Sequence, residues 1–137
     1  MELKDLSNFA NSRFSDTFDY EPFNPLNPDE KMGFTVTIKS AKQDECKRFI
    51  EENARKAAIE RFNAQKAGRL YIPNLKDEHK KDIDFCVLAT ERFNNLTKDG
   101  KPYGETKEEI TDIYKGFEWL VVQVIQAAAD DANFLQA

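Results

Sequence analysis

The sequence predicts an α+β fold, a helix-dominated single domain in which a small N-terminal antiparallel β-hairpin is followed by about four helices. The stretch FTVTI is β-branched and alternating, which is typical of a strand. Downstream of it, apolar residues recur at three- and four-residue spacing, which indicates amphipathic helices. The 137 residues include only 5 Gly and 5 Pro, with 40% hydrophobic and 33% charged residues. That composition favours a folded, helix-rich protein of one domain.

The hairpin is expected between two short runs near the N-terminus. Residues 1–16 mix Ser, Asn and Asp with isolated apolar residues, so we expect a flexible N-terminal arm there and a single domain over residues 17–137. From Thr17 the apolar spacing changes to period two, and Pro22–Gly33 then interrupts the chain with three prolines. We therefore expect the run after Thr17 to pair with Phe34–Ile38 across a long loop. The aromatic residues of this region either fold back as core or engage a partner: Phe9, Phe14, Phe18, Tyr20 and Phe23.

A long helix is expected next, over residues 41–67. Ser40 and Gln43 have the spacing of a capping box, and Gly68 follows as a left-handed C-terminal residue. The apolar residues of this segment recur at helical spacing and are assigned to one stripe: Cys46, Phe49, Ile50, Ala54, Ala57, Ala58 and Phe62.

The segment RLYIPNLKD is read as a connector, with a short extended piece at Leu70–Ile72. Asp77 is expected to cap the following helix, over residues 78–96. Because residues 83–89 leave little polar face, we expect this helix to be central and buried.

Two more helices complete the expected order. Asp99-Gly100 has the composition of a tight turn. Thr106 with Glu109 forms a second capping box, which predicts a short helix to Tyr114, and Gly116 separates that helix from the last one.

Charge and composition argue against several classes of protein. The net charge of −5 gives no basic footprint, so neither nucleic acid nor an anionic membrane is an expected partner. No segment reaches the roughly 18 apolar residues of a membrane span, and the N-terminus lacks the apolar stretch of a signal peptide, so a reducing cytoplasm is expected.

Catalysis and metal binding find little support in the sequence. Cys46 and Cys86 are isolated and His79 is the single histidine, so we expect buried reduced thiols and no metal site. Glu78, His79 and Asp82 lie close in sequence, but a solvated helix start explains them without acid–base chemistry. We expect no catalytic residue, no cofactor and no enzyme activity.

The last helix, FEWLVVQVIQAAADDANFL, is apolar on two sides. One stripe suffices to dock a helix on its own domain, since burying a large apolar side chain contributes roughly 1.5–3 kcal/mol. The second stripe is covered either by further helices of the same chain or by another protein molecule, and both alternatives stay open. The candidate partner-binding residues are Phe117, Trp119, Leu120, Val121, Val122, Val124, Ile125, Ala129, Phe134 and Leu135.

This C-terminal segment resembles the closing signature of the tail assembly chaperones of long, non-contractile-tailed (lambda-like) bacteriophages. Upstream, ATERFNNLTKDGKPYGETKEEI and GFTVTIKSAKQDECKRF resemble two earlier blocks of that family, so that the resemblance extends over residues 34–135. One departure is Phe93, where relatives often carry Trp. The positions that match the closing signature are Phe117, Trp119, Leu120, Gln123, Val124, Ala128, Asp131, Ala132, Asn133 and Phe134.

The resemblance implies a non-enzymatic protein of the infected cell. It implies binding to the tape measure protein, recruitment of tail tube protein, a location in the host cytoplasm and absence from the mature virion. This chain would be the shorter, non-frameshifted form, with self-association and a longer frameshifted chaperone form as further partners. The alternatives are a structural tail or head–tail connector protein retained in the virion, a small cellular adaptor and, last, an enzyme.

Overall fold

The computed structural model describes residues 13–136, so residues 1–12 of the predicted arm lie outside the described part of the chain. Within that part, the helices are α1 (Asp44–Lys66), α2 (Leu75–Ala89), α3 (Lys107–Gly116), α4 (Glu118–Ala129) and the 3-10 turn η2 (Asp131–Asn133). The strands are β1 (Arg13–Phe14), β2 (Thr17–Tyr20), β3 (Phe23–Asn24), β4 (Asn27–Lys31), β5 (Thr35–Lys39), β6 (Thr90–Asn94), β7 (Thr97–Lys98), β8 (Lys101–Pro102) and β9 (Leu135–Gln136). The predicted α+β class is confirmed, although strands also follow α2 and α4.

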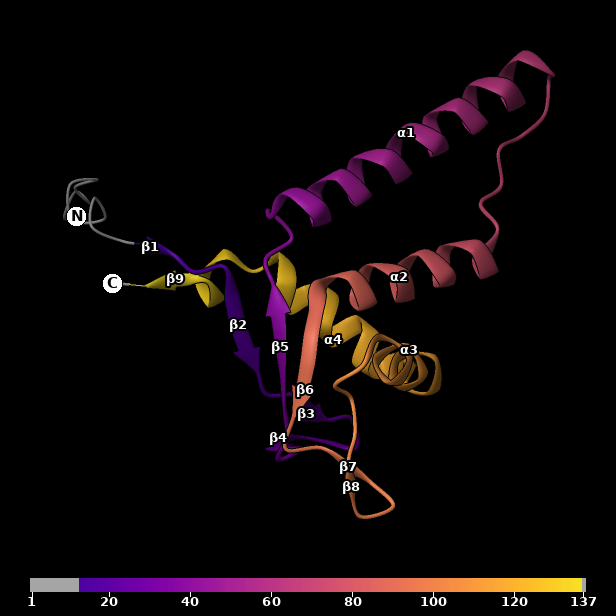
Figure 1. Ribbon diagram of the computed structural model, residues 1–137. Helices are drawn as coiled ribbons and strands as arrows, with labels where there is room; N and C mark the ends of the chain where they lie inside the picture. The colour runs from indigo at the N-terminus through magenta and orange to yellow at the C-terminus, as the bar shows by residue number, and fades with distance from the viewer. Residues whose placement is uncertain (1–12, 137) are drawn as a thin grey trace.

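A three-stranded antiparallel sheet, in the order β2-β5-β6, is the centre of the fold (Figure 1). The predicted pairing across the proline-rich loop is confirmed, with Phe18 opposite Ile38. The loop itself folds back as the small β3-β4 hairpin, which the sequence did not indicate.

Strand β6 corrects the prediction of one helix over residues 78–96, because α2 ends at Ala89. Phe93 lies opposite Val36 in the sheet, and its ring packs between those of Phe34 and Tyr114, with centroids 6.0 and 5.6 Å away. Pairing with β5 and burial of Phe93 therefore outweigh the local helical pattern.

Helices α2, α3 and α4 pack together beside the sheet, and α4 crosses one of its faces (Figure 1). Their shared interior contains side chains with almost no exposure, among them Tyr114, Leu120 and Val124. The hydroxyl oxygens of Tyr114 and Thr90 lie 2.6 Å apart in this interior, so the one buried phenol has a hydrogen-bond partner.

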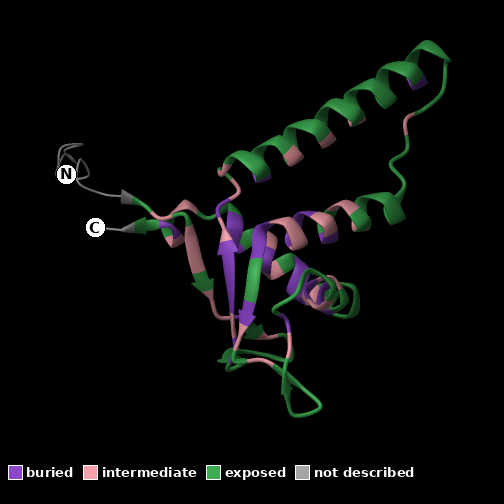
Figure 2. Cartoon of the chain, viewed as in Figure 1, coloured by how far each residue is buried: buried purple, intermediate pink, exposed green. Residues whose placement is uncertain are grey.

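Helix α1 has a different environment, because it extends obliquely away from the sheet and diverges from α2 (Figure 1). Most of its residues are exposed (Figure 2), and only Cys46 and Ala64 are buried among those of the helix. The predicted stripe is therefore covered at its N-terminal end, where the ring centroids of Phe49 and Phe85 lie 6.3 Å apart. Toward Phe62 the stripe is left open to solvent.

The ends of α1 and α2 correct two predicted caps. Gln43 makes no side-chain cap for α1; its amide instead donates a hydrogen bond to the carbonyl of Asp16, and the helix begins at Asp44. Asn74, rather than Asp77, caps α2 by accepting from the N–H groups of residues 76 and 77. The predicted Gly68 closure of α1 is confirmed by its φ of +71°.

The turn and cap downstream of β6 are confirmed. Asp99 and Gly100 have φ of 53° and 77°, as a two-residue hairpin loop between β7 and β8 requires. The Thr106 hydroxyl accepts from the Glu109 N–H at 3.2 Å, which caps α3. No helix of the described residues 13–136 is both long enough and apolar enough to cross a membrane.

Candidate partner-binding groove

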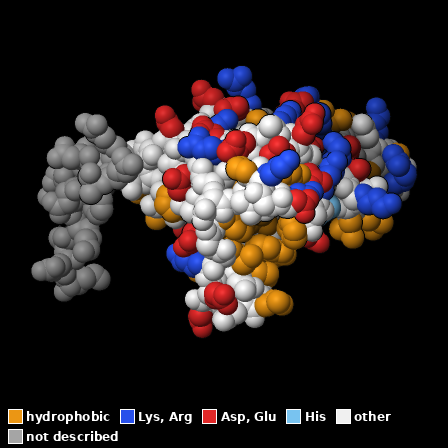
Figure 3. Space-filling model, turned by 60° about the horizontal axis from the view of Figure 1, so that its bottom comes forward, with side chains coloured by type: hydrophobic (Ala, Val, Ile, Leu, Met, Phe, Trp, Pro, Cys, Tyr) orange, Lys and Arg blue, Asp and Glu red, His pale blue; other side chains and the backbone are white. Residues whose placement is uncertain are grey.

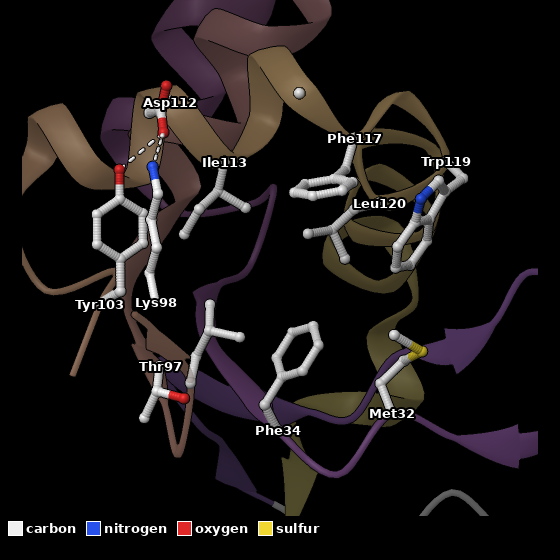
Figure 4. Close-up of a pocket in the computed structure, with 12 residues that line it drawn as sticks. Met32, Phe34, Thr97, Lys98, Tyr103, Asp112, Ile113, Phe117, Trp119 and Leu120 are labelled. Atoms are coloured by element: carbon white, nitrogen blue, oxygen red, sulfur yellow. Dashed lines mark hydrogen bonds and ion pairs between the residues drawn. The ribbon is translucent and has the colours of Figure 1, made fainter. Parts of the chain in front are cut away.

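An apolar groove of about 470 Å³ opens beside the junction of α3 and α4. Figure 4 shows side chains from four separate parts of the chain turned toward it. They come from the segment just before β5, from residues 96–103, from the end of α3 and from the start of α4. The apolar lining residues are Met32, Phe34, Leu96, Ile113, Phe117, Trp119 and Leu120.

The floor and the wall of the groove differ in exposure. Phe34, Ile113 and Leu120 are buried and belong to the core, so they form a fixed floor. Phe117 is 50% exposed and its ring lies 6.1 Å from that of Trp119 in an edge-to-face arrangement. An apolar side chain that entered the groove would therefore contact aromatic rings without moving the core.

The opposite rim is polar and internally neutralised. The Tyr103 hydroxyl donates to the Asp112 carboxylate at 2.7 Å, and Lys98 Nζ lies 3.6 Å from the same carboxylate (Figure 4). The hydrogen bond from Tyr103, helped by the charge of Lys98, lowers the pKa of Asp112, and the same bond raises the pKa of Tyr103 to about 12. The rim therefore presents no free net charge, which suits an uncharged, apolar ligand.

Gly104 holds this rim against the sheet. Its carbonyl accepts from the Phe93 N–H at 2.8 Å, and a Cβ added at Gly104 would lie 2.7 Å from the Cβ of Phe93. Its φ of +98° also favours glycine. The Gly104 N–H in turn donates to the Glu109 carboxylate at 2.8 Å, which lowers the pKa of that carboxyl group.

The structure brings three of the predicted binding residues, Phe117, Trp119 and Leu120, to this groove. Ile125 and Ala129 instead line a second, smaller groove of about 290 Å³ between α4, α2 and the start of α1. The remaining five divide between core and surface. Val121, Val124 and Phe134 are buried, whereas Val122 and Leu135 are exposed.

Sequence reasoning missed the groove residues that lie outside α4, chiefly Met32, Phe34 and Leu96. The sequence predicts a strand from Phe34 to Ile38, but nothing near Phe34 in the sequence indicates that it faces the last helix. Leu96 reaches the groove because α2 ends before β6, and the Tyr103 N–H then bonds to the Leu96 carbonyl at 2.9 Å. No local signal was available, because the groove depends on that unpredicted strand.

Several residues of the C-terminal signature have structural contacts. The Gln123 amide accepts from the Tyr20 hydroxyl and the Phe23 N–H, both at 2.9 Å, and donates to the Phe23 carbonyl at 3.0 Å. Asn133 donates to the Ala127 carbonyl at the end of α4. Phe134 is fully buried, with its ring 5.8 Å from Phe14 and 6.0 Å from Phe18. These positions hold the N-terminal strands against α4.

Among the candidate titratable residues, His79 Nδ1 lies 3.8 Å from the Glu118 carboxylate. Burial and the neighbouring Glu78 raise the pKa of Asp82, and the nearby His79 partly opposes that rise. Cys46 and Cys86 are both buried and free, as predicted, and burial raises the pKa of each thiol. Among residues 13–136, no group of three His, Cys, Asp or Glu side chains is placed to hold a metal ion.

Hydrophobic side chains gather on the face of the molecule that carries the lower loops of Figure 1, as the turned view in Figure 3 shows.

Comparisons of the chain with protein-family models, with curated proteins and with solved structures find no match. The apolar groove therefore stands on its own geometry as the candidate site.

Proposed function

We propose that this protein is a non-enzymatic tail assembly chaperone that binds apolar helical segments of a tape measure protein in the groove beside α3 and α4. The observation that supports the proposal is an open, apolar groove at Phe117, Trp119 and Leu120, within the segment that resembles the chaperone signature. Recognition of an amphipathic helix in an apolar groove is a recurring mode of peptide binding.

The chemistry of the groove favours this ligand over a small polar molecule. The walls are aromatic and aliphatic, and the Asp112 carboxylate at the rim is already paired with Lys98 and hydrogen-bonded by Tyr103. A groove of this size lies in the range of ordinary ligand sites, roughly 300–1,000 Å³. Side chains of a helix would enter it, while the helix backbone would stay outside.

The wider role follows from the resemblance and is part of the same proposal. The chaperone would keep the tape measure protein soluble in the host cytoplasm, help to recruit tail tube protein around it, and be absent from the mature virion. Its other partners would be a longer frameshifted form and further copies of itself. A net charge of −5 supports solubility of such complexes.

Co-expression with the tape measure protein of the same phage tests the proposal. We expect the wild-type chain to increase the soluble fraction of that partner, and Phe117→Lys to abolish the increase, because a charge would occupy the apolar wall. Leu70→Lys is the matched control, since Leu70 is even more exposed and does not line the groove. Val122→Lys separates binding in the groove alone from binding along the whole exposed side of α4.

Two results would contradict the proposal. One is a wild-type chain that leaves the tape measure protein insoluble. The other is Phe117→Lys that keeps full activity while circular dichroism shows an unchanged fold. Mass spectrometry of purified virions addresses the alternative of a structural tail or head–tail connector protein, because such a protein would be found in the particle.

A further inference from the structure

A row of apolar side chains on α1 is left largely exposed by the rest of the described chain. Ile50, Ala54, Ala58 and Phe62 are spaced four residues apart, so they follow one ridge of the helix. Ile50 is 46% exposed, Phe62 is 63% exposed, and both alanines are exposed. The ridge lies on the helix that extends away from the sheet (Figure 1).

The ridge is self-complementary in the antiparallel direction. Its large side chains are at the two ends and its small ones are in the middle, centred on residue 56. An antiparallel copy therefore brings Ile50 opposite Phe62 of the second copy, and Ala54 opposite Ala58 of the second copy. The alanines allow the two backbones the close approach, about 8 Å, that tightly packed helices reach. We infer that α1 pairs with α1 of a second copy of this chain through this ridge.

The charges of α1 favour the same arrangement. Residues 44–52 carry four acidic and two basic side chains, whereas residues 55–66 carry four basic and one acidic. An antiparallel pair places the acidic half of each helix beside the basic half of the other, and a parallel pair would place like halves together. Charge complementarity of this kind selects orientation and partner more than it adds affinity.

The size of the contact sets the expected strength. A helix of 23 residues is about 34 Å long, and each copy adds only two large apolar side chains to the contact. Such an interface lies at the low end of specific protein contacts, so the dimer is weak and depends on concentration. The ridge shares no residue with the groove beside α3 and α4, and the inference does not rest on the proposed function.

Disulfide trapping tests the register. Ala54→Cys and Ala58→Cys are purified separately, one of them with an affinity tag, then mixed and oxidised. We expect the mixed pair to form a linked dimer several-fold faster than either variant alone. Lys56→Cys is the control, because residue 56 is exposed but points away from the ridge. Equal linking of all three variants, or none, would overturn the inference.

Sedimentation equilibrium tests the ridge without a cross-link. Phe62→Glu removes two large side chains per dimer, and we expect it to weaken the dimer by roughly a hundredfold, about tenfold for each copy. Ile59→Glu is the matched control, since Ile59 is similarly exposed and lies off the ridge, and its dimer should be nearly unchanged. A wild-type chain that stays monomeric, or a dimer that Phe62→Glu leaves intact, would refute the pairing.

Discussion

Helix α4 is apolar on almost every side, and its neighbours cover most of it. Helix α1 instead carries charges along its length and leaves three of its large apolar side chains exposed, Ile50, Ile59 and Phe62. Five residues of α4 are buried, against two in the much longer α1. The difference arises from position. Helix α4 crosses the sheet and contacts α2 and α3, while α1 touches α2 near its start and then diverges (Figures 1 and 2).

The comparison teaches that apolar character in a sequence does not locate a binding surface. On α4 the apolar side chains of one side, Trp119, Val122 and Ile125, have three different environments. Trp119 lines the groove beside α3 and α4, Ile125 lines the smaller groove, and Val122 is 52% exposed to solvent. On α1 a weaker pattern remains open toward Phe62, because α2 covers only the N-terminal part of that helix. Exposure depends on the neighbours that the fold provides.

The largest expected contrast is between two phenylalanines. Phe134→Ala should lower the free energy of unfolding by about 3–5 kcal/mol, because it leaves a cavity between Phe14 and Phe18. Phe62→Ala on exposed α1 should change it by less than about 0.5 kcal/mol at concentrations where the chain is monomeric. Urea denaturation of both variants measures the difference, and equal losses would break the comparison.

Hydrogen exchange should show the next contrast. We expect the amides of residues 120–128 in α4 to exchange only through global unfolding, and those of residues 57–66 in α1 to exchange through local fraying, at least about a hundredfold faster. Mass spectrometry after a deuterium pulse resolves the two segments. Similar protection in both would mean that α1 is held as firmly as α4. Measurement at increasing protein concentration shows whether pairing of copies provides that protection.

A smaller effect is expected at the polar contact between α4 and the N-terminal strands. Gln123→Ala removes the amide that bonds to Tyr20 and to both backbone groups of Phe23, and should cost about 1–2 kcal/mol. Gln65→Ala at an exposed position of α1 is the matched change and should be nearly neutral. Thermal denaturation followed by circular dichroism provides the comparison, and a neutral Gln123→Ala would show that the contact adds no net stability.

The smallest expected effect is at the rim of the groove. Tyr103→Phe removes the hydrogen bond that lowers the pKa of Asp112, so that pKa should rise toward its ordinary value of about 3.9. Because the folded-state pKa is lowered, the stabilisation from this bond is present at neutral pH and is lost as the pH falls through the pKa of Asp112. Carboxyl NMR titration of wild type and variant measures the shift, and coincident titration curves would contradict the assignment.

Local sequence signals located much of the secondary structure. The Asp99-Gly100 turn and the Thr106 cap each depend on residues close together in sequence, and both are present. The β2–β5 pairing, which joins two segments with their own alternating patterns across the proline-rich loop, is present as well. The Ser40–Gln43 box is absent, because the Ser40 hydroxyl accepts from the Lys42 N–H and the Gln43 side chain donates to the Asp16 carbonyl. The sequence predicted only some of the residues that line the groove. Phe117, Trp119 and Leu120 were identified from their own helix, but Met32, Phe34 and Leu96 were not.

The sequence by itself determined where the helices start to within about three residues, because caps and apolar spacing act over a few residues. It also indicated which two segments near the N-terminus pair as strands, because each has its own alternating pattern. Only the tertiary structure decided that residues 90–94 form a strand, that the last helix ends at Ala129 rather than Leu135, that two distant segments meet the junction of α3 and α4 in one groove, and that α1 stands clear of the sheet. Those outcomes depend on long-range pairing and packing, in which a residue's environment is set by segments far from it in the chain.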